Sequence, residues 1–172
     1  PELQMAGGEF CGNATRSAAY LALKGKLGEI NIKVSGVNKT LKAGIDLQGN
    51  TWSQMPIYED SKLIKQNKKY SVVPLVGITL VVINRKNKFI NQEIAKKEAL
   101  IILKKLKLLN SVTASGVMFI YKKKGQLNIE PVVWVRDIKT FFYETACASG
   151  TTAVGIFEAI GTGKNVNSLP VI

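Results

Sequence analysis

The fold is decided at residues 9–15, which read Glu9-Phe10-Cys11-Gly12-Asn13-Ala14-Thr15. The stretch that follows, Arg16 to Leu23, is rich in Ala and Leu and predicts a helix that ends at Gly25 or Gly28. Cys11 is therefore expected at the N-terminus of a helix made mostly of small side chains. Such a helix is suited to burial among strands, because its backbone can approach its neighbours closely.

A second stretch of the chain repeats this pattern. Residues 144–151 read Glu144-Thr145-Ala146-Cys147-Ala148-Ser149-Gly150-Thr151, and Ala153 to Ile160 predict a short helix that ends at Gly161 or Gly163. Each copy contains a carboxylate, a Cys, a small residue, a polar residue and then a small-residue helix. This weak internal repeat predicts two similar halves with one cysteine in each.

The segments between the two motifs predict an α/β (α+β) chain with two domains, residues 1–66 carrying Cys11 and residues 67–172 carrying Cys147. In the first half, alternating segments predict a meander of strands over 29–37, 39–47 and 51–57, followed by a polar linker over 58–69. In the second half we expect strands over 72–83, with a bend at Gly77, and over 116–121, 126–135 and 140–144. Between the first two of these strands we expect a helix over 92–109, capped by Asn91. The apolar stripe of this helix is predicted to be Ile94, Ile101, Ile102 and Leu106.

Composition excludes several classes of protein. The 172 residues are 46% hydrophobic and 21% charged, which is typical of a globular chain with a real core. The longest apolar run, Val72 to Ile83, is too short to cross a bilayer, so no membrane partner is expected. The net charge of +12 is spread over dispersed lysines that do not alternate with aromatic residues. We therefore interpret the lysines as solvated and expect no nucleic-acid partner.

The residues that could carry chemistry are few. With no His and two Cys, a metal site would need carboxylates to complete it, so none is expected. Ser-His and Cys-His catalysis are excluded within this chain for the same reason. The two Cys are either buried core thiols or reactive ones. A single Cys before an Ala-rich helix favours the first interpretation, whereas two in matching contexts favour the second.

Two cysteines at helix N-termini predict a particular reaction. The helix dipole favours the thiolate, and the free N–H groups that follow form a site for a carboxylate. The expected substrate-binding residues are small or cap-forming: Gly12, Asn13, Ala148, Ser149 and Gly150. If the halves face each other, one thiolate removes the α-proton of an amino acid while the opposed thiol protonates the other face. This inversion needs no metal, pyridoxal or flavin, so no cofactor is expected.

At these residues the chain resembles the diaminopimelate epimerase family. Residues 9–16 are close to the family's Cys-Gly-Asn-Gly/Ala-x-Arg motif, and residues 144–151 are similar to its Cys-Gly-Thr/Ser-Gly motif, with Ala148 replacing the first Gly. The resemblance covers nearly the whole chain. It implies two domains, each a curled, mostly antiparallel sheet around a central helix, with the active site in the cleft between them. It also implies that Cys11 and Cys147 are the catalytic pair of a cofactor-independent racemase or epimerase.

Departures from the family pattern concern the substrate. Where the family has Gly-Asn-Pro-His, this chain has Gly77-Ile78-Thr79-Leu80. Near the position of a family Asn it has Val117 and Met118, and in place of the family's Glu-Arg-Gly it has residues 136–139. We therefore expect a different, less polar amino acid than diaminopimelate. Family members also extend further at both ends, and residue 1 is not a Met, so we expect this chain to be a truncated piece of a cytoplasmic protein.

Three alternatives stay open. The first is diaminopimelate epimerase activity itself. The second is the related isomerase branch that resembles the phenazine-biosynthesis fold and uses a carboxylate; two well-placed Cys argue against it. The third is a non-catalytic basic module that binds nucleic acid or an acidic partner, which salt-dependent DNA binding would support. The sequence also leaves open which amino acid is the substrate and whether the protein is a homodimer.

Overall fold

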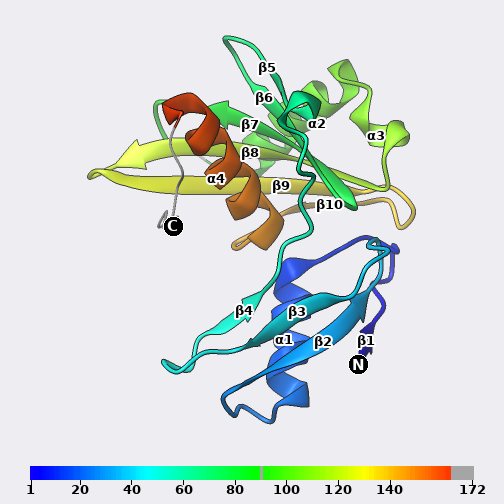
Figure 1. The fold of residues 1–172 in the computed structure, drawn as a ribbon. Coiled ribbons are helices and arrows are strands. Elements are labelled where there is room, and N and C mark those ends of the chain that lie inside the picture. The colour runs from blue at the N-terminus through cyan, green and yellow to red at the C-terminus, as the bar shows by residue number, and fades with distance from the viewer. Residues whose placement is uncertain (90, 164–172) are drawn as a thin grey trace.

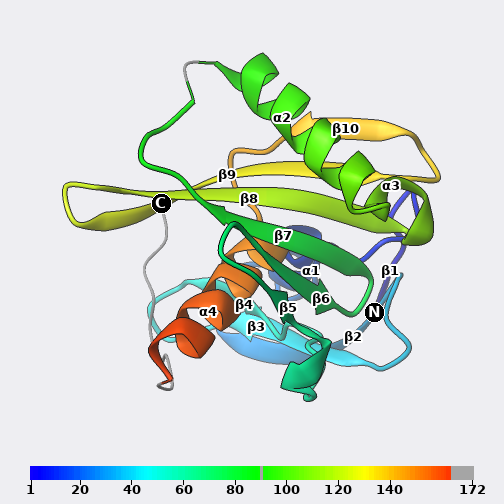
Figure 2. The same cartoon turned by 90° about the horizontal axis from the view of Figure 1, so that it is seen from above.

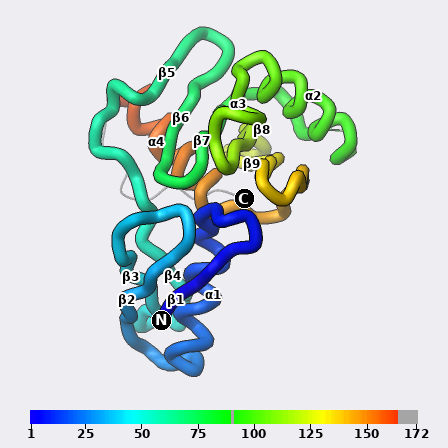
Figure 3. Tube along the Cα trace, turned by 90° about the vertical axis from the view of Figure 1, so that its right-hand side faces the viewer, coloured from blue at the N-terminus to red at the C-terminus, as the bar shows by residue number. Residues whose placement is uncertain are grey.

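The computed structural model describes residues 1–89 and 91–163, which form two sheets with helices packed against them (Figure 1). The mixed α/β architecture confirms the predicted fold class. The predicted second domain also includes residues 164–172, which lie outside the described residues. Figure 3 shows the two units as separate parts of the trace, with the first unit in blue to cyan.

The first unit is a four-stranded sheet with one helix, α1, against it. Strand β1 pairs parallel with β2, and β2, β3 and β4 follow as an antiparallel meander in the order β1-β2-β3-β4. The core between α1 and the sheet contains Phe10, Ala19, Ile32 and Leu41. The elements are β1 (Glu2–Leu3), α1 (Gly12–Ala22), β2 (Gly28–Val34), β3 (Leu41–Ile45) and β4 (Thr51–Ser53).

The second unit is a six-stranded sheet in the order β10-β9-β8-β7-β6-β5. All of its pairs are antiparallel except β7 with β8, which the helices α2 and α3 connect. Because β5 pairs with β6, this sheet begins at Lys65, just before the predicted domain division at residues 66 and 67. The elements are a 3-10 turn (Ser61–Leu63), β5 (Lys65–Gln66), β6 (Ser71–Leu75), β7 (Ile78–Asn84), α2 (Gln92–Lys105), α3 (Leu108–Ser111), β8 (Ala114–Lys123), β9 (Gln126–Val135), β10 (Thr140–Tyr143) and α4 (Ala148–Thr162).

Helices cover both faces of the six-stranded sheet. Figure 2 shows α2 on one side of the sheet, and α4 together with the first unit on the other. Strand β8 contributes side chains to the cores on both faces of the sheet, because successive side chains of a strand point in opposite directions. Its Val117 and Phe119 pack in the core under α2, whereas Met118 and Ile120 pack in the core under α4. The face that carries α4 is therefore the one turned toward Cys11.

One predicted strand is two strands. Residues 72–83 were expected to form a single strand bent at Gly77, but β6 and β7 form an antiparallel hairpin with Leu75 opposite Ile78. Gly77 has a φ of +86°, which is the left-handed conformation that a tight turn requires. The Gly therefore reverses the chain where we expected it to bend. The turn lies against the first unit, since a side-chain carbon added to Gly77 would lie 3.1 Å from the Phe10 Cβ.

The predicted stripe of α2 is also wrong in part. Asn91 caps the helix as predicted, since its side chain accepts a hydrogen bond from the N–H of Ile94. The fully buried side chains, however, are Ala95, Ala99 and Leu103, while Ile94 is 42% exposed and Ile101 is 67% exposed. Small alanines let the helix backbone approach the sheet closely, and this close packing determines which face is buried. The helix ends earlier than expected, because Lys107 adopts a left-handed conformation between α2 and α3.

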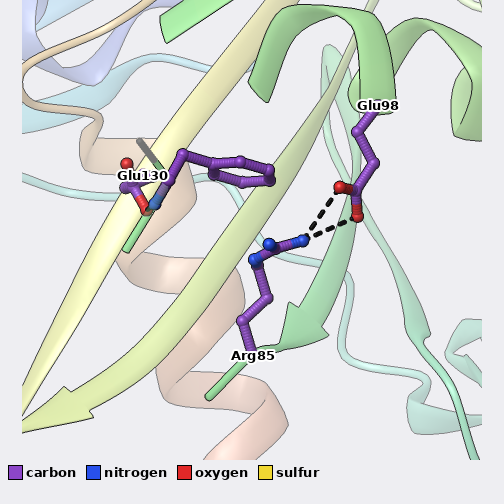
Figure 4. Close-up of polar contacts among 4 residues, drawn as sticks. Arg85, Glu98 and Glu130 are labelled. Carbon is purple, nitrogen blue, oxygen red and sulfur yellow. Dashed lines mark hydrogen bonds and ion pairs between the residues drawn. The ribbon is translucent and has the colours of Figure 1, made fainter. Parts of the chain in front are cut away.

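A polar network fixes the connection between β7 and α2 (Figure 4). Arg85 donates two hydrogen bonds to Glu98 of α2, each 2.9 Å long, and its guanidinium lies 3.7 Å from the centre of the Phe89 ring. Glu130 of β9 is buried, and it accepts hydrogen bonds from the N–H of Phe89 and the hydroxyl of Tyr143. Both carboxylate oxygens of this buried Glu therefore have a donor, as a buried charge requires.

No helix among the described residues is both long enough and apolar enough to cross a membrane.

Candidate active site

Each cysteine caps the helix that follows it. Cys11 is the N-cap of α1, and its sulfur accepts a hydrogen bond from the N–H of Ala14 at 3.5 Å. Cys147 is the N-cap of α4, and its sulfur accepts one from the N–H of Gly150 at 3.3 Å. Both cysteines have extended backbone conformations, as N-cap residues do. The sequence repeat thus corresponds to two copies of one local structure.

The N-termini of α1 and α4 meet at the contact between the two units. A side-chain carbon added to Gly12 would lie only 2.8 Å from the Cβ of Ala148, so these helix ends touch. The side chain of Asn13 donates a hydrogen bond across the contact to the carbonyl of Ala146, at 3.0 Å. Only a residue without a side chain at position 12 allows the two helix ends to approach this closely.

One pocket contains both cysteines. It has a volume of about 80 Å³, and Cys11 and Cys147 line it from the two units. The neighbouring residues of both motifs also line it, and its apolar wall comes from the sheet of the second unit. The other lining residues are Glu9, Phe10, Gly12, Asn13, Ile78, Ala114, Val133, Val135, Glu144, Ala148 and Ser149.

The pocket faces open hydrogen-bond donors. In each helix the cysteine sulfur uses the N–H of the third helical residue, and the cysteine carbonyl accepts from the fourth, Thr15 or Thr151. The first two N–H groups of each helix have no intrahelical acceptor, as at every helix start. These belong to Gly12 and Asn13 in α1, and to the two residues after Cys147 in α4. Two positive helix ends therefore converge on a site suited to a carboxylate.

The expected thiolate is not favoured at Cys147. Burial raises the pKa of the Cys147 thiol well above its ordinary value, and the nearby Glu144 carboxylate raises it further. The N–H of Gly150 acts in the opposite direction but is the smaller effect. Burial also raises the pKa of Glu144, whereas its interaction with Cys147 lowers it. Cys11 is more exposed than Cys147, so the two thiols occupy different environments.

The structure places most, but not all, of the predicted substrate-binding residues in this pocket. Gly12, Asn13, Ala148 and Ser149 line it. Gly150 does not line it, because its N–H is bound to the Cys147 sulfur and its Cα faces Met118.

Of the positions that depart from the diaminopimelate epimerase pattern, only one faces the pocket. Ile78 lines it, whereas Val117 and Met118 are core residues on the two faces of β8. The lack of a polar residue at 117 and 118 therefore bears on packing and not on the pocket wall.

Two carboxylates in the pocket were missed by the sequence analysis as site residues. Glu9 precedes Cys11 by two positions, Glu144 precedes Cys147 by three, and both line the pocket. The signal was present, since both motif copies begin with a Glu. Among the described residues, no three His, Cys, Asp or Glu side chains gather in a group that could hold a metal ion.

A larger cavity lies on the α2 side of the sheet. Its volume is about 490 Å³, and Phe89, Glu130 and Tyr143 line it. Neither cysteine is part of its wall, although Glu144 lines both this cavity and the two-cysteine pocket. The two cysteines therefore share the smaller pocket and do not contribute to this cavity.

Comparison with known proteins identifies the family. The sequence model of a family described as "Histidine racemase CntK N-terminal domain" matches residues 1–170. The chain belongs to this histidine racemase family. Relatives named histidine racemase occur in two strains of Fusobacterium nucleatum subsp. nucleatum. In strain ATCC 23726 the identity is 32% over 181 residues, covering 99% of this chain. In strain ATCC 25586 it is 33% over 166 residues, covering 90% of this chain.

A more distant member of the histidine racemase family is found in Staphylococcus aureus strain Mu50. It is 22% identical over 174 residues, covering 91% of this chain. The chain spans 66%, 61% and 58% of the lengths of the three relatives, which is less than two thirds in each case.

Proposed function

We propose that the protein containing this chain is a cofactor-independent amino-acid racemase that uses Cys11 and Cys147 as a two-base pair. One observation carries the proposal: two cysteines, each at the start of a helix, line one pocket from two structural units. Membership of a family described by histidine racemases supports the reaction class. The open N–H groups beside each thiol support an amino-acid carboxylate as the group that is bound.

The geometry accounts for the difficult step of racemisation. The α-carbon of an amino acid is a very weak acid, so charge must be stabilised on its carboxylate as the proton leaves. The open N–H groups at the starts of α1 and α4 would supply that stabilisation. One cysteine, as a thiolate, removes the α-proton from one face of the carbon, and the other, as a thiol, donates a proton to the opposite face. The configuration inverts, and the thiol and thiolate have exchanged roles.

The environment of Cys147 supports a starting role for this residue as the acid. Because burial and Glu144 raise the pKa of Cys147, this residue is the thiol in the ligand-free pocket. In the direction in which Cys147 donates its proton, Cys11 is the proposed base. After a turnover in this direction Cys11 holds the proton and Cys147 is the thiolate, so Cys147 must regain a proton before the next turnover in the same direction. In the reverse reaction Cys147 is the base.

Histidine is the proposed substrate, because the relatives that match the chain are named histidine racemases. The pocket wall combines apolar side chains with the carboxylates of Glu9 and Glu144. This combination fits a side chain that has both an apolar ring and an N–H donor. Diaminopimelate remains the alternative substrate implied by the resemblance of the two cysteine motifs, and the same assay distinguishes them.

The test is α-proton exchange in D₂O with the full-length protein and no added cofactor. Loss of the α-proton signal of L-histidine is followed by NMR, and the D-isomer is quantified by chiral chromatography. Cys11→Ser and Cys147→Ser should each slow racemisation by about 10²- to 10⁴-fold, because an alcohol is a far poorer base than a thiolate. Each variant retains one thiol and can therefore differ in which enantiomer still exchanges. Racemisation at the parent rate in both variants would exclude the two-thiol mechanism.

A further inference from the structure

Among the described residues two glutamates are buried, Glu9 and Glu130, and they differ in how their carboxylates are hydrogen-bonded. Glu130 is 2% exposed, and its two carboxylate oxygens accept hydrogen bonds from Phe89 and Tyr143. Glu9 is 9% exposed, and its Oε2 atom has no hydrogen-bond partner among the described residues. Glu9 lines the two-cysteine pocket, whereas Glu130 does not.

The structure holds the Glu9 carboxylate in place without pairing it. Ser35 fixes the backbone, because its hydroxyl donates to the Glu9 carbonyl at 2.8 Å and accepts from the N–H of Met5 at 2.9 Å. Gly7 makes room for the carboxylate, since a side-chain carbon at that position would lie 2.7 Å from the Glu9 Oε2. The same added carbon would also contact Val135, so the carboxylate lies against the end of β9.

A buried carboxylate oxygen without a donor carries a large desolvation cost. At Glu130 the fold offsets this desolvation cost with two hydrogen-bond donors. Glu130 therefore shows how this chain hydrogen-bonds a buried carboxylate whose role is structural. At Glu9 the carboxylate instead lines a pocket that already offers N–H donors for a ligand carboxylate. The group that satisfies Glu9 is therefore expected to arrive with the ligand, as an N–H donor or a cation.

The two carboxylates of the pocket lie at different places along β9. The N–H of Glu144 is bound to the carbonyl of Pro131, and the Glu144 side chain interacts with the Cys147 thiol. The Glu9 carboxylate lies near Val135, which is four residues further along the strand than Pro131. Glu144 already interacts with the Cys147 thiol, whereas the Glu9 Oε2 has no hydrogen-bond partner among the described residues, so Glu9 is the pocket carboxylate left to meet the substrate side chain.

We propose that Glu9 is the specificity-determining residue of this pocket, where its carboxylate accepts a hydrogen bond from an N–H donor or cation on the substrate side chain. The inference rests on the proposed function and names its substrate class, an amino acid whose side chain carries such a group. An imidazole N–H is one such donor, and its bond to a carboxylate is of the charge-assisted kind. A neutral side chain of the same size would leave Glu9 unsatisfied and is therefore disfavoured.

The test compares two ligands that differ at the side-chain donor. Histidine and 2-thienylalanine have five-membered rings of similar size, but the thiophene ring has no N–H. In calorimetric titrations of the full-length protein, Glu9→Gln should weaken histidine binding by about 10- to 100-fold, the effect of losing a hydrogen bond to a charged group. Binding of 2-thienylalanine should change by less than about twofold, because it makes no bond to Glu9. The matched control is Glu130→Gln, which alters a buried glutamate outside the pocket and should leave the ratio of the two affinities unchanged.

A second variant tests the cost of the charge itself. Glu9→Met is similar in size and removes the unsatisfied carboxylate, so it should raise the melting temperature of the ligand-free protein while abolishing the preference for histidine. Equal weakening of both ligands in Glu9→Gln, or no weakening of either, would overturn the inference even if the parent protein racemises histidine. If the parent protein neither binds nor exchanges histidine, the proposed function fails and this inference fails with it.

Discussion

At the scale of single residues, the two thiols should differ in reactivity even though they occupy equivalent positions in a repeat. Alkylation requires a thiolate that the reagent can reach. Cys147 is buried and its pKa is raised, whereas Cys11 is partly exposed. We expect iodoacetamide to label Cys11 faster than Cys147 in the native protein at neutral pH, as measured by mass spectrometry of the digested peptides. Equal rates in the native state would contradict this asymmetry, and equal rates after denaturation serve as the control.

The charge of Glu144 gives a second prediction for the same thiol. Burial is the main cause of the raised pKa of Cys147, and the Glu144 carboxylate is the next. Glu144→Gln removes that charge, so the pKa of Cys147 should fall and its pH–labelling profile should move to lower pH. Because thiolate content changes tenfold per pH unit below the pKa, labelling at a fixed pH should accelerate several-fold. Glu130→Gln, which changes a carboxylate outside this pocket, should not move the profile.

At the scale of elements, the sequence was most informative where a side chain determines an end of a helix. Asn91 and both cysteines cap helices at the predicted positions, because capping depends on neighbours within a few residues. Tertiary contacts determined the rest. The buried face of α2 consists of Ala95, Ala99 and Leu103, because small residues fit closely against β8 and β9. A hydrophobicity pattern favoured the larger isoleucines instead and could not anticipate that fit.

The junction of β9, β10 and the β7–α2 connection provides a stability prediction. Tyr143→Phe removes the donor for one oxygen of the buried Glu130, so the free energy of unfolding in urea should fall by about 1–3 kcal/mol. Burial, together with Glu130, raises the pKa of Tyr143 above its usual 10.0. The stabilisation is therefore complete below pH 10 and decreases as the pH rises further. Tyr58→Phe, at a tyrosine that is 48% exposed, should change stability by less than about 0.5 kcal/mol.

At the scale of the whole molecule, the pocket exists only because the two units meet. Local sequence patterns predicted that each cysteine lies at the start of a helix, and the internal repeat suggested that the two helix starts face each other. The sequence did not reveal that Glu9 and Glu144 line the same pocket or that Gly150 lies outside it, because these facts depend on the approach of two sheets. The wall residues from β7, β8 and β9, such as Ile78 and Val133, have no motif that distinguishes them from core residues.

Close contact between the helix ends leads to the last prediction. A methyl group at position 12 would lie 2.8 Å from the Ala148 Cβ and 3.0 Å from the Met55 sulfur, so Gly12→Ala must push α1 and α4 apart. A shift of about 1 Å between opposed acid and base can cost about 10²-fold in rate, so racemisation should fall by that order while each unit keeps its fold. The matched control is Gly155→Ala in the interior of α4, where no atom beyond the chain neighbours and the helix's own backbone lies within 4 Å of the added carbon.

This control should stabilise the protein by about 0.5–1 kcal/mol and leave the rate unchanged, because Ala favours the helix and touches nothing at the site. Far-ultraviolet circular dichroism and thermal unfolding of both variants would separate a displaced helix end from a loss of structure. If Gly12→Ala racemises at the parent rate with an unchanged melting temperature, the helix N-termini do not need to touch. The pocket would then have to place its two thiols by some other contact between the units.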